Sequence, residues 1–251
     1  MKKPFLHIIA LCVAFLLGVP ISFAAGEGAT LRYQLGEKSF AAHVETAASP
    51  AKGTVFIIHD WDGLTDYEKS RAKMLSDLGF DAIAVDLFGV DVQLESRDDY
   101  KRETSALYKD RSQFRERISA AINAGINSGT SREKIVIIGY CFGGAATLEA
   151  ARAGLKADGF VSFHGGLKTP EGQDYSQTTA PVLLLHGSAD PVSGMEDLAA
   201  LINQLKDAKV PHNAEIFGGA RHSFTVQGSR DYDAQADQKS WQALQRFLAK
   251  L

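Results

Sequence analysis

Three residues in the second half of the chain have the types and the order of a nucleophile, an acid and a base. Cys141 lies in the glycine-flanked segment Gly-Tyr-Cys-Phe-Gly, Asp190 lies 49 residues after it (141 to 190), and His222 a further 32 residues on (190 to 222). Such a set can perform nucleophilic catalysis, in which His222 takes the thiol proton and Asp190 fixes the tautomer of the imidazole. Taken singly, Asp190 before Pro191 also fits a plain turn, and His222 also fits a solvated loop.

The segment around Cys141 is typical of a nucleophile elbow, a sharp strand-to-helix turn of the form G-x-nucleophile-x-G. Glycines are expected at Gly139 and Gly143 because the turn brings backbone segments too close for a Cβ atom. A helix that starts after Cys141 and the base His222 both favour the thiolate, so we expect the thiol to be accessible and partly ionised near neutral pH. The backbone N–H of Phe142 would then face a developing oxyanion. A buried Cys that acts as a small hydrophobe is the alternative.

The elements that must position these residues follow a strand–helix alternation, which indicates βαβ units in an open α/β sandwich. Ligands of such sheets bind outside the carboxyl ends of the strands, where Asp60, Cys141, Asp190 and several His residues fall. Residues 91–99 are expected to form a solvated loop before a helix, as part of a cap over the cleft. Strands are expected at residues 31–35, 39–44, 54–59, 80–85, 135–138, 160–163, 182–185 and 214–217, and helices at 67–78, 110–127, 145–153, 195–205 and 235–250.

The N-terminus has the anatomy of a secretory signal. Lys2 and Lys3 precede an apolar run over residues 5–17, and Ser22 and Ala24 suit a signal-peptidase site. The run is too short to span a membrane. We therefore expect residues 1–24 to be a signal peptide, residues 25–251 to form a single domain, and the mature protein to be exported, periplasmic or secreted. An uncleaved anchor is the alternative.

Composition excludes several classes of function. Of the 251 residues, 45% are hydrophobic and 23% charged, and the formal charge of -3 gives no basic footprint for nucleic acid. We expect no nucleic-acid partner, no membrane association after signal cleavage, and a monomer. His59, His164 and His186 each end a predicted strand without a close ligand pair, so we expect no metal site and no cofactor.

The motifs Gly-Tyr-Cys-Phe-Gly-Gly, Leu-His-Gly-Ser-Ala-Asp-Pro and Arg-His-Ser-Phe resemble those of the dienelactone hydrolases (carboxymethylenebutenolidases), and the resemblance covers residues 54–251. It implies an α/β-hydrolase fold, a mostly parallel central sheet with helices on both faces. It also implies hydrolysis of small esters or lactones through a Cys141–His222–Asp190 triad and an acyl-enzyme. A thioesterase, a cysteine peptidase, and a non-catalytic ligand-binding or thiol-reactive protein on the same fold are the alternatives.

The family resemblance extends to the loop His-Asp-Trp-Asp-Gly-Leu after the third predicted strand. It implies that the backbone N–H of Trp61 completes the oxyanion hole with that of Phe142. Asp60 stands where the family usually has Glu, whose carboxylate interacts with the resting thiol. Whether Asp60, one methylene shorter, takes that role is left open. We expect Asp60 and His164 to line the substrate cleft or to support the triad from behind.

One departure from the family concerns the substrate. Enzymes that act on dienelactone place an Arg a few residues after the catalytic His to bind the substrate carboxylate, whereas residues 223–227 here are Ser-Phe-Thr-Val-Gln. We expect Val226 to take that position, and neutral small esters or lactones to be hydrolysed at least as well as dienelactone. The alternative is that Arg71, Arg221 or Arg230 reaches the cleft from another loop.

Overall fold

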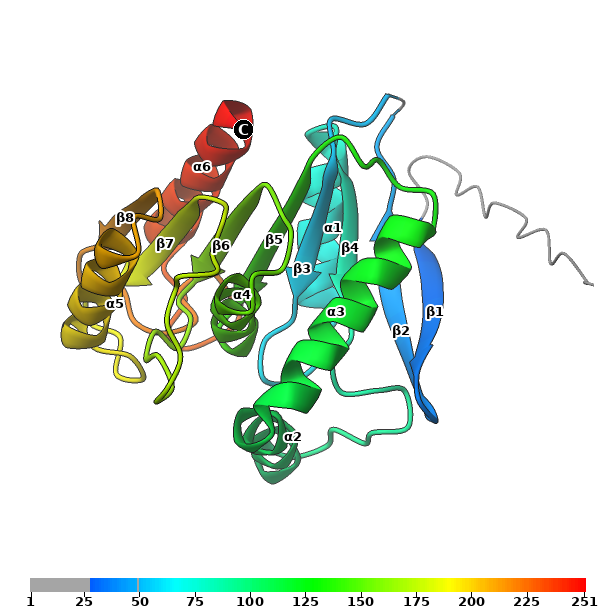
Figure 1. Ribbon diagram of the computed structural model, residues 1–251, viewed down its shortest axis with the longest axis horizontal. Coiled ribbons are helices and arrows are strands. Elements are labelled where there is room, and N and C mark those ends of the chain that lie inside the picture. The colour runs from blue at the N-terminus through cyan, green and yellow to red at the C-terminus, as the bar shows by residue number, and fades with distance from the viewer. Residues whose placement is uncertain (1–27, 49) are drawn as a thin grey trace, which may run out of the picture.

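One eight-stranded sheet organises the part of the chain that the computed structural model describes, residues 28–48 and 50–251 (Figure 1). The predicted signal peptide, residues 1–24, lies outside the described residues. The strands are β1 (Ala29–Leu35), β2 (Lys38–Glu45), β3 (Thr54–Ile58), β4 (Asp81–Val85), β5 (Ile135–Tyr140), β6 (Gly159–Phe163), β7 (Val182–Gly187) and β8 (His212–Phe217). The helices are α1 (Asp66–Asp77), α2 (Arg97–Lys109), α3 (Arg111–Asn127), α4 (Phe142–Arg152), α5 (Met195–Asp207) and α6 (Ala234–Lys250).

The strand order across the sheet is β1-β2-β4-β3-β5-β6-β7-β8. The hairpin β1–β2 is antiparallel, and β2 also pairs antiparallel with β4. Every other neighbouring pair is parallel, and parallel strands require crossover connections such as the helices between them. The predicted mostly parallel α/β-hydrolase fold is therefore confirmed.

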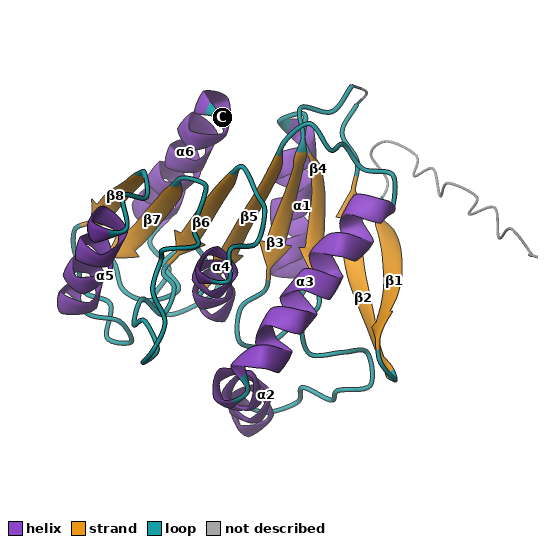
Figure 2. Cartoon of the chain, viewed as in Figure 1, coloured by secondary structure: helices purple, strands orange, loops and turns teal. Residues whose placement is uncertain are grey.

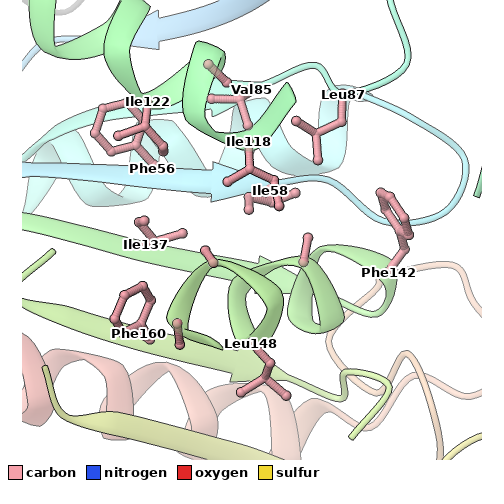
Figure 3. Packing of buried hydrophobic residues seen from close by; sticks show 14 of the residues in the cluster. Phe56, Ile58, Val85, Leu87, Ile118, Ile122, Ile137, Phe142, Leu148 and Phe160 are labelled. Atoms are coloured by element: carbon pink, nitrogen blue, oxygen red, sulfur yellow. The ribbon is translucent and has the colours of Figure 1, made fainter. Parts of the chain in front are cut away.

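Helices cover both faces of the sheet: α3, α4 and α5 lie on one face, and α1 and α6 on the other (Figure 2). The central strand β3 is buried along its whole length, which explains why its sequence is an unbroken apolar run rather than an alternating one. Phe56 and Ile58 of β3 pack against Ile118 and Ile122 of α3 (Figure 3). No helix in the described part of the chain combines the length and apolar character needed to cross a membrane.

Helix α2 is the main departure from the predicted elements. The expected loop over residues 91–99 ends early, because α2 begins at Arg97 and runs to Lys109 before the predicted helix at residues 110–127. Its start is a capping box, in which Asp99 N–H donates to Ser96 Oγ and Ser96 N–H donates to the Asp99 carboxylate. The helix was missed because it is strongly charged and buries little apolar surface; its buried residues are Thr104 and Leu107.

Candidate active site

Cys141 occupies a strained turn between β5 and α4. Its φ of 51° and ψ of -109° lie where a residue with a side chain is rarely found. A Cβ atom added at Gly139 would lie 2.0 Å from the carbonyl oxygen of Gly143, and one added at Gly143 would lie 2.0 Å from that of Ile58. The predicted glycines are thus required by the close approach of β3, β5 and the first turn of α4.

The structure brings the three predicted residues into one hydrogen-bonded chain. His222 Nε2 lies 2.9 Å from Cys141 Sγ, and His222 Nδ1 lies 2.7 Å from Asp190 Oδ2. Asp190 is in the loop after β7 and His222 in the loop after β8. The backbone N–H of Ala189 donates to the carbonyl of Ala220 at 3.0 Å and so joins the two loops. The arrangement allows His222 to accept a proton from the thiol at Nε2, while the Asp190 carboxylate accepts a hydrogen bond from Nδ1–H and stays ionised.

Asp190 is held in its ionised form. Burial alone would raise the pKa of this carboxyl, but the hydrogen bond with His222 and the backbone N–H groups of Val192 and Ser193 lower it below its ordinary value. Val192 N–H donates to Asp190 Oδ1 at 2.8 Å and Ser193 N–H at 3.2 Å. A carboxylate with this many donors stays charged and can orient the imidazole.

The protonation state of Cys141 corrects the sequence-based expectation. Burial raises the pKa of the Cys141 thiol well above its ordinary value, and the Asp60 carboxyl raises it further, against a smaller opposing effect of the Phe142 N–H. The resting residue is therefore a thiol, and the start of α4 does not by itself produce a thiolate. The expected accessibility is found, because Cys141 is partly exposed and lines a cavity.

Asp60 faces the nucleophile from the loop after β3. The side chain is buried, and burial, followed by the charge of Asp62, raises its pKa to about 7. One carboxyl oxygen accepts the backbone N–H of Trp61 at 2.5 Å. The same carboxyl interacts with the Cys141 side chain. A side chain one methylene shorter than Glu thus still reaches the thiol.

The two backbone donors predicted for an oxyanion hole differ in their surroundings. The Phe142 N–H lies against the Cys141 sulfur and favours its charged form. The Trp61 N–H instead donates to the Asp60 carboxyl. The second donor therefore becomes available to a ligand only when the Asp60 side chain turns away from it.

His164 was expected either to line the cleft or to support the triad from behind. It has the second role, because it contacts the backbone of the elbow and is not among the residues that line the cavity. The ring is fully buried, at 0% exposure, and its Nδ1 accepts the Cys141 backbone N–H at 3.2 Å. Its Nε2 lies 2.8 Å from Thr225 Oγ1. Burial and the neighbouring His222 lower its pKa well below the ordinary value, so the ring is neutral and Nε2 carries the proton donated to Thr225.

A network that sequence reasoning missed fixes the loop that carries His222. Thr225 Oγ1 bonds the Tyr67 hydroxyl at 2.5 Å, and the Thr225 carbonyl accepts from Arg71 at 3.0 Å. Arg71 also bonds Asp237 of α6 at 2.5 Å. These contacts hold Arg71 behind the triad, so it does not supply the cation proposed for the cleft. The pairing spans three distant segments, and no local sequence signal predicts it.

A cavity of about 740 Å³ opens in front of the thiol. Cys141, His222, Phe142 and Trp61 form its floor. One wall is the face of α2 that carries Arg97, Lys101, Thr104 and Tyr108, and the rim opposite includes Pro191, Val192, Ser229 and Arg230. Val226 and Arg221 are not among the lining residues, whereas Arg230 is. Arg97, within residues 91–99 that were predicted to cap the cleft, lines the cavity, but the contribution of Lys101, Thr104 and Tyr108 of α2 was not predicted from the sequence.

The three His residues that end strands have separate partners. His59 Nδ1 lies 2.5 Å from the Asp60 carbonyl, His164 bonds Thr225, and His186 Nε2 lies 2.9 Å from the Ser193 carbonyl. Within residues 28–48 and 50–251, no group of three or more His, Cys, Asp or Glu side chains is arranged to hold a metal ion.

Comparison with known proteins gives consistent results. The profile of the Dienelactone hydrolase family matches residues 40–251. A Saccharolobus solfataricus protein described as "Putative carboxymethylenebutenolidase" is 27% identical over 84% of this chain and 93% of its own length. A Bradyrhizobium protein described as "Probable 2-oxo-3-(5-oxofuran-2-ylidene)propanoate lactonase" is 25% identical over 79% of this chain and 82% of its own. The chain also matches the crystal structure of a dienelactone hydrolase-like promiscuous phosphotriesterase from metagenomic libraries. The two sequences are 31% identical, and the structures superpose with a TM-score of 0.84 over 90% of this chain and 98% of that one.

Proposed function

The chain belongs to the dienelactone hydrolase family and is an ester or lactone hydrolase, and from this premise we propose that it works by covalent catalysis at Cys141. The observation that carries the proposal is the unbroken chain from Cys141 Sγ to His222 Nε2 and from His222 Nδ1 to Asp190, at 2.9 and 2.7 Å. Both distances suit proton transfer and orientation of the base without any rearrangement of the backbone.

The proposed reaction starts from the neutral thiol. When a carbonyl carbon approaches the sulfur, His222 Nε2 takes the thiol proton as the S–C bond forms, and the carbonyl oxygen becomes an oxyanion. Collapse of this intermediate breaks the C–O bond to the alcohol, which leaves with the proton from His222. Water then attacks the thioester carbonyl, and His222 takes a proton from this water. The C–S bond breaks, His222 gives the proton to the departing sulfur, and the acid is released with Cys141 again a thiol.

Asp60 and Trp61 link substrate binding to stabilisation of the oxyanion. In the proposed mechanism, the Asp60 carboxyl leaves the Trp61 N–H as the substrate carbonyl enters, so that this donor joins the Phe142 N–H. Preorganised backbone donors of this kind contribute about 2.7–4 kcal/mol each to transition-state stabilisation. Since the Asp60 pKa lies at about 7, its carboxyl changes between the neutral and the ionised form near neutral pH.

Turnover of a panel of small esters, lactones and thioesters, with burst kinetics, tests the proposal. We expect a burst of alcohol that matches the enzyme concentration, as an acyl-enzyme predicts. His222→Ala should lower kcat by roughly 10³-fold or more, because a triad without its base keeps only binding and oxyanion stabilisation. His212→Ala on β8, outside the site, is the matched control and should keep wild-type kcat.

Two results would overturn this mechanism. Absence of turnover on the whole panel would favour a non-catalytic thiol-reactive or ligand-binding protein on the same fold. Activity that survives His222→Ala but disappears on treatment with a chelator would transfer the chemistry to a metal ion.

Aryl phosphotriesters are a second candidate class of substrate. The observation that favours them is the phosphotriesterase relative, which matches this chain over nearly its whole length at 31% identity. A phosphoryl oxygen can use the same backbone donors as a carbonyl oxygen. We expect Cys141→Ala to abolish the release of 4-nitrophenol from both a diethyl phosphotriester and an acetate ester. If the variant loses only the hydrolysis of the acetate ester, the two reactions do not share Cys141.

We further propose that the protein is exported as a monomer. The support is the Lys-Lys pair, apolar run and Ser-x-Ala pattern at residues 1–24, and the lack of any sequence feature that demands a second copy. N-terminal sequencing from the native cell should give a start near Ala25, and gel filtration should give the mass of one chain. A start at Met1 in the cytoplasmic fraction would contradict export.

A further inference from the structure

Three cationic side chains line the cavity in front of Cys141, from two separate segments. Arg97 and Lys101 are one turn apart on the inner face of α2, and Arg230 lies on the opposite rim. None of them is part of the hydrogen-bonded chain of the triad. Their presence favours the alternative in which a cation, such as Arg230, reaches the cleft from another segment.

The charges around the cavity do not cancel. Asp231 is the one carboxylate among the lining residues, and it contacts Arg221 at 2.9 Å and, more loosely, Arg230 at 3.6 Å. Lys101 has a loose contact of 3.7 Å with Asp98, and Arg97 has no ion pair with any carboxylate that the structure describes. The cavity mouth is therefore positive on a protein whose net charge is negative. An anionic ligand would be attracted to it.

Aromatic and apolar side chains line much of the cavity between the cations and the thiol. The Arg97 guanidinium lies 5.3 Å above the Trp61 ring, which fixes the cation at the edge of the cavity. Tyr108 and Phe142 pack with their ring centroids 5.6 Å apart beside the nucleophile, and Val192 exposes 65% of its surface at the rim. A volume of about 740 Å³ is within the range that holds a drug-sized molecule, well beyond the need of a simple lactone.

The geometry of α2 sets the distance between the two ends of a ligand. Tyr108 lies beside Phe142 and the thiol, and Lys101 precedes it by seven residues, or about 10 Å along the helix axis. Arg97 lies one further turn away. A carboxylate bound by these cations would therefore be separated from the scissile carbonyl by a ring or a chain.

We propose that Arg97 and Lys101, with Arg230 opposite, form the specificity subsite for a carboxylate at the far end of an aromatic or extended ester. The proposal rests on the proposed ester hydrolysis and specifies its substrate class. Because the cations are exposed, each contributes a modest, salt-dependent attraction. Together they should give a preference of about 5- to 30-fold in kcat/KM.

A matched pair of substrates tests the charge: 4-acetoxycinnamate and 4-acetoxycinnamamide, which differ only in the carboxylate. We expect the acid to be hydrolysed with about 5- to 30-fold higher kcat/KM near 0.02 M salt, and the ratio to approach one near 0.5 M salt. The double variant Arg97→Gln/Lys101→Gln should remove most of this ratio. Arg102→Gln/Lys109→Gln, with the same charge change on the outer face of α2, should leave it intact. The carboxylate of the isomer 2-acetoxycinnamate is closer to the ester, so its kcat/KM should exceed that of its own amide by a smaller factor.

A binding experiment separates this inference from the catalytic proposal. In the Cys141→Ala protein, calorimetric titration with 4-acetoxycinnamate should show binding that weakens by about 5- to 30-fold in the Arg97→Gln/Lys101→Gln background. Equal binding of acid and amide, or equal kcat/KM in an enzyme that hydrolyses both, would overturn the subsite and leave the triad untouched. Failure of the wild type to hydrolyse either ester, with selective binding of the acid, would overturn the proposed chemistry and support the subsite.

Discussion

Two buried carboxylates, Glu149 and Asp60, lie in one molecule but have opposite properties. Glu149 on α4 is fully buried and accepts hydrogen bonds from Arg115 at 2.7 Å, Arg152 at 2.8 Å and Arg111 at 3.2 Å. Burial alone would raise its pKa, but the arginines lower it below the ordinary value. Asp60 is almost as buried, has no Lys or Arg at ion-pair distance among the described residues, and its pKa is raised to about 7.

The difference shows that cation partners, rather than burial, decide the state of each group. The Glu149 cluster joins α3 to α4 and so fixes the helix whose first residues follow the nucleophile. Asp60 lacks such compensation and lies against the thiol, where its charge can be gained or lost. The first carboxylate stabilises the fold, and the second adjusts the site.

Removal of the charge on Glu149 should give the largest effect on stability. Glu149→Gln leaves three arginines around a neutral side chain, and Arg152, at 3% side-chain exposure, cannot reach water. We expect the free energy of unfolding at neutral pH to fall by about 3–5 kcal/mol, as for other broken buried ion pairs. Urea denaturation followed by circular dichroism measures the change, and kcat per folded molecule should stay near the wild-type value.

Arg115→Gln is the matched control for the Glu149 cluster. Its side chain is 36% exposed, so loss of this partner should cost only about 0.5–1 kcal/mol. The Glu149 contribution is present above the carboxyl's unfolded pKa and is lost as the pH falls through the lower folded value. Equal destabilisation by the two variants would contradict the assignment of Glu149 as the centre of the cluster.

Asp60→Asn should increase the free energy of unfolding, by less than Glu149→Gln decreases it. The folded state favours protonated Asp60, so stability falls as the pH rises from the unfolded pKa of about 4 to the folded value of about 7. Asn mimics the protonated carboxyl and removes this loss. We expect the variant to exceed the wild type by about 1–4 kcal/mol near pH 8, and by little near pH 4, in urea unfolding at both values.

The exposed Asp207→Asn is the control for the Asp60 variant, because its side chain is 76% exposed and should change stability little at either pH. A gain of the same size for Asp60→Asn at both pH values would mean that better packing, rather than titration, is responsible. A loss near pH 8 would show that the ionised carboxylate stabilises the fold.

The smallest predicted effect concerns the reactivity of the nucleophile. The Asp60 carboxyl raises the pKa of the Cys141 thiol, so Asp60→Asn should lower that pKa. A decrease of one unit gives about tenfold more thiolate and hence faster alkylation by iodoacetamide near pH 7.5. Mass spectrometry of the protein without residues 1–24 measures the rate at Cys141. An unchanged rate would assign the raised pKa to burial alone.

The sequence predicted the parts of the site whose signals are local. Gly139, Cys141 and Gly143 predicted the elbow, because a tight turn permits few other residues at these positions. Asp190 was found because it follows the buried strand β7, and His222 because it follows the last strand, β8. Parallel strands deliver their following loops to the same edge of the sheet. The nearly continuous apolar runs of the central strands likewise identified the sheet.

The parts that were missed depend on contacts between distant segments. The thiol was expected to be partly ionised because of the start of α4 and His222, but burial, followed by Asp60 from the loop after β3, raises its pKa. Helix α2 had a capping signal in Ser96 and Asp99, yet its charged composition resembled a solvated loop. Arg97 and Lys101 were therefore recognised as cations of the cavity only once α2 was placed beside the thiol.

Arg71 makes the position of the catalytic base depend on segments that are synthesised late. Its two partners, Thr225 and Asp237, lie 154 and 166 residues further along the chain, and the second belongs to the last helix. A ribosome that has released only the first 200 residues has made Cys141 and the whole elbow, but neither His222 nor the clamp that holds its loop. The nucleophile is thus made before its base, and the loop that carries the base gains all its Arg71 contacts only after α6 has brought Asp237 to Arg71.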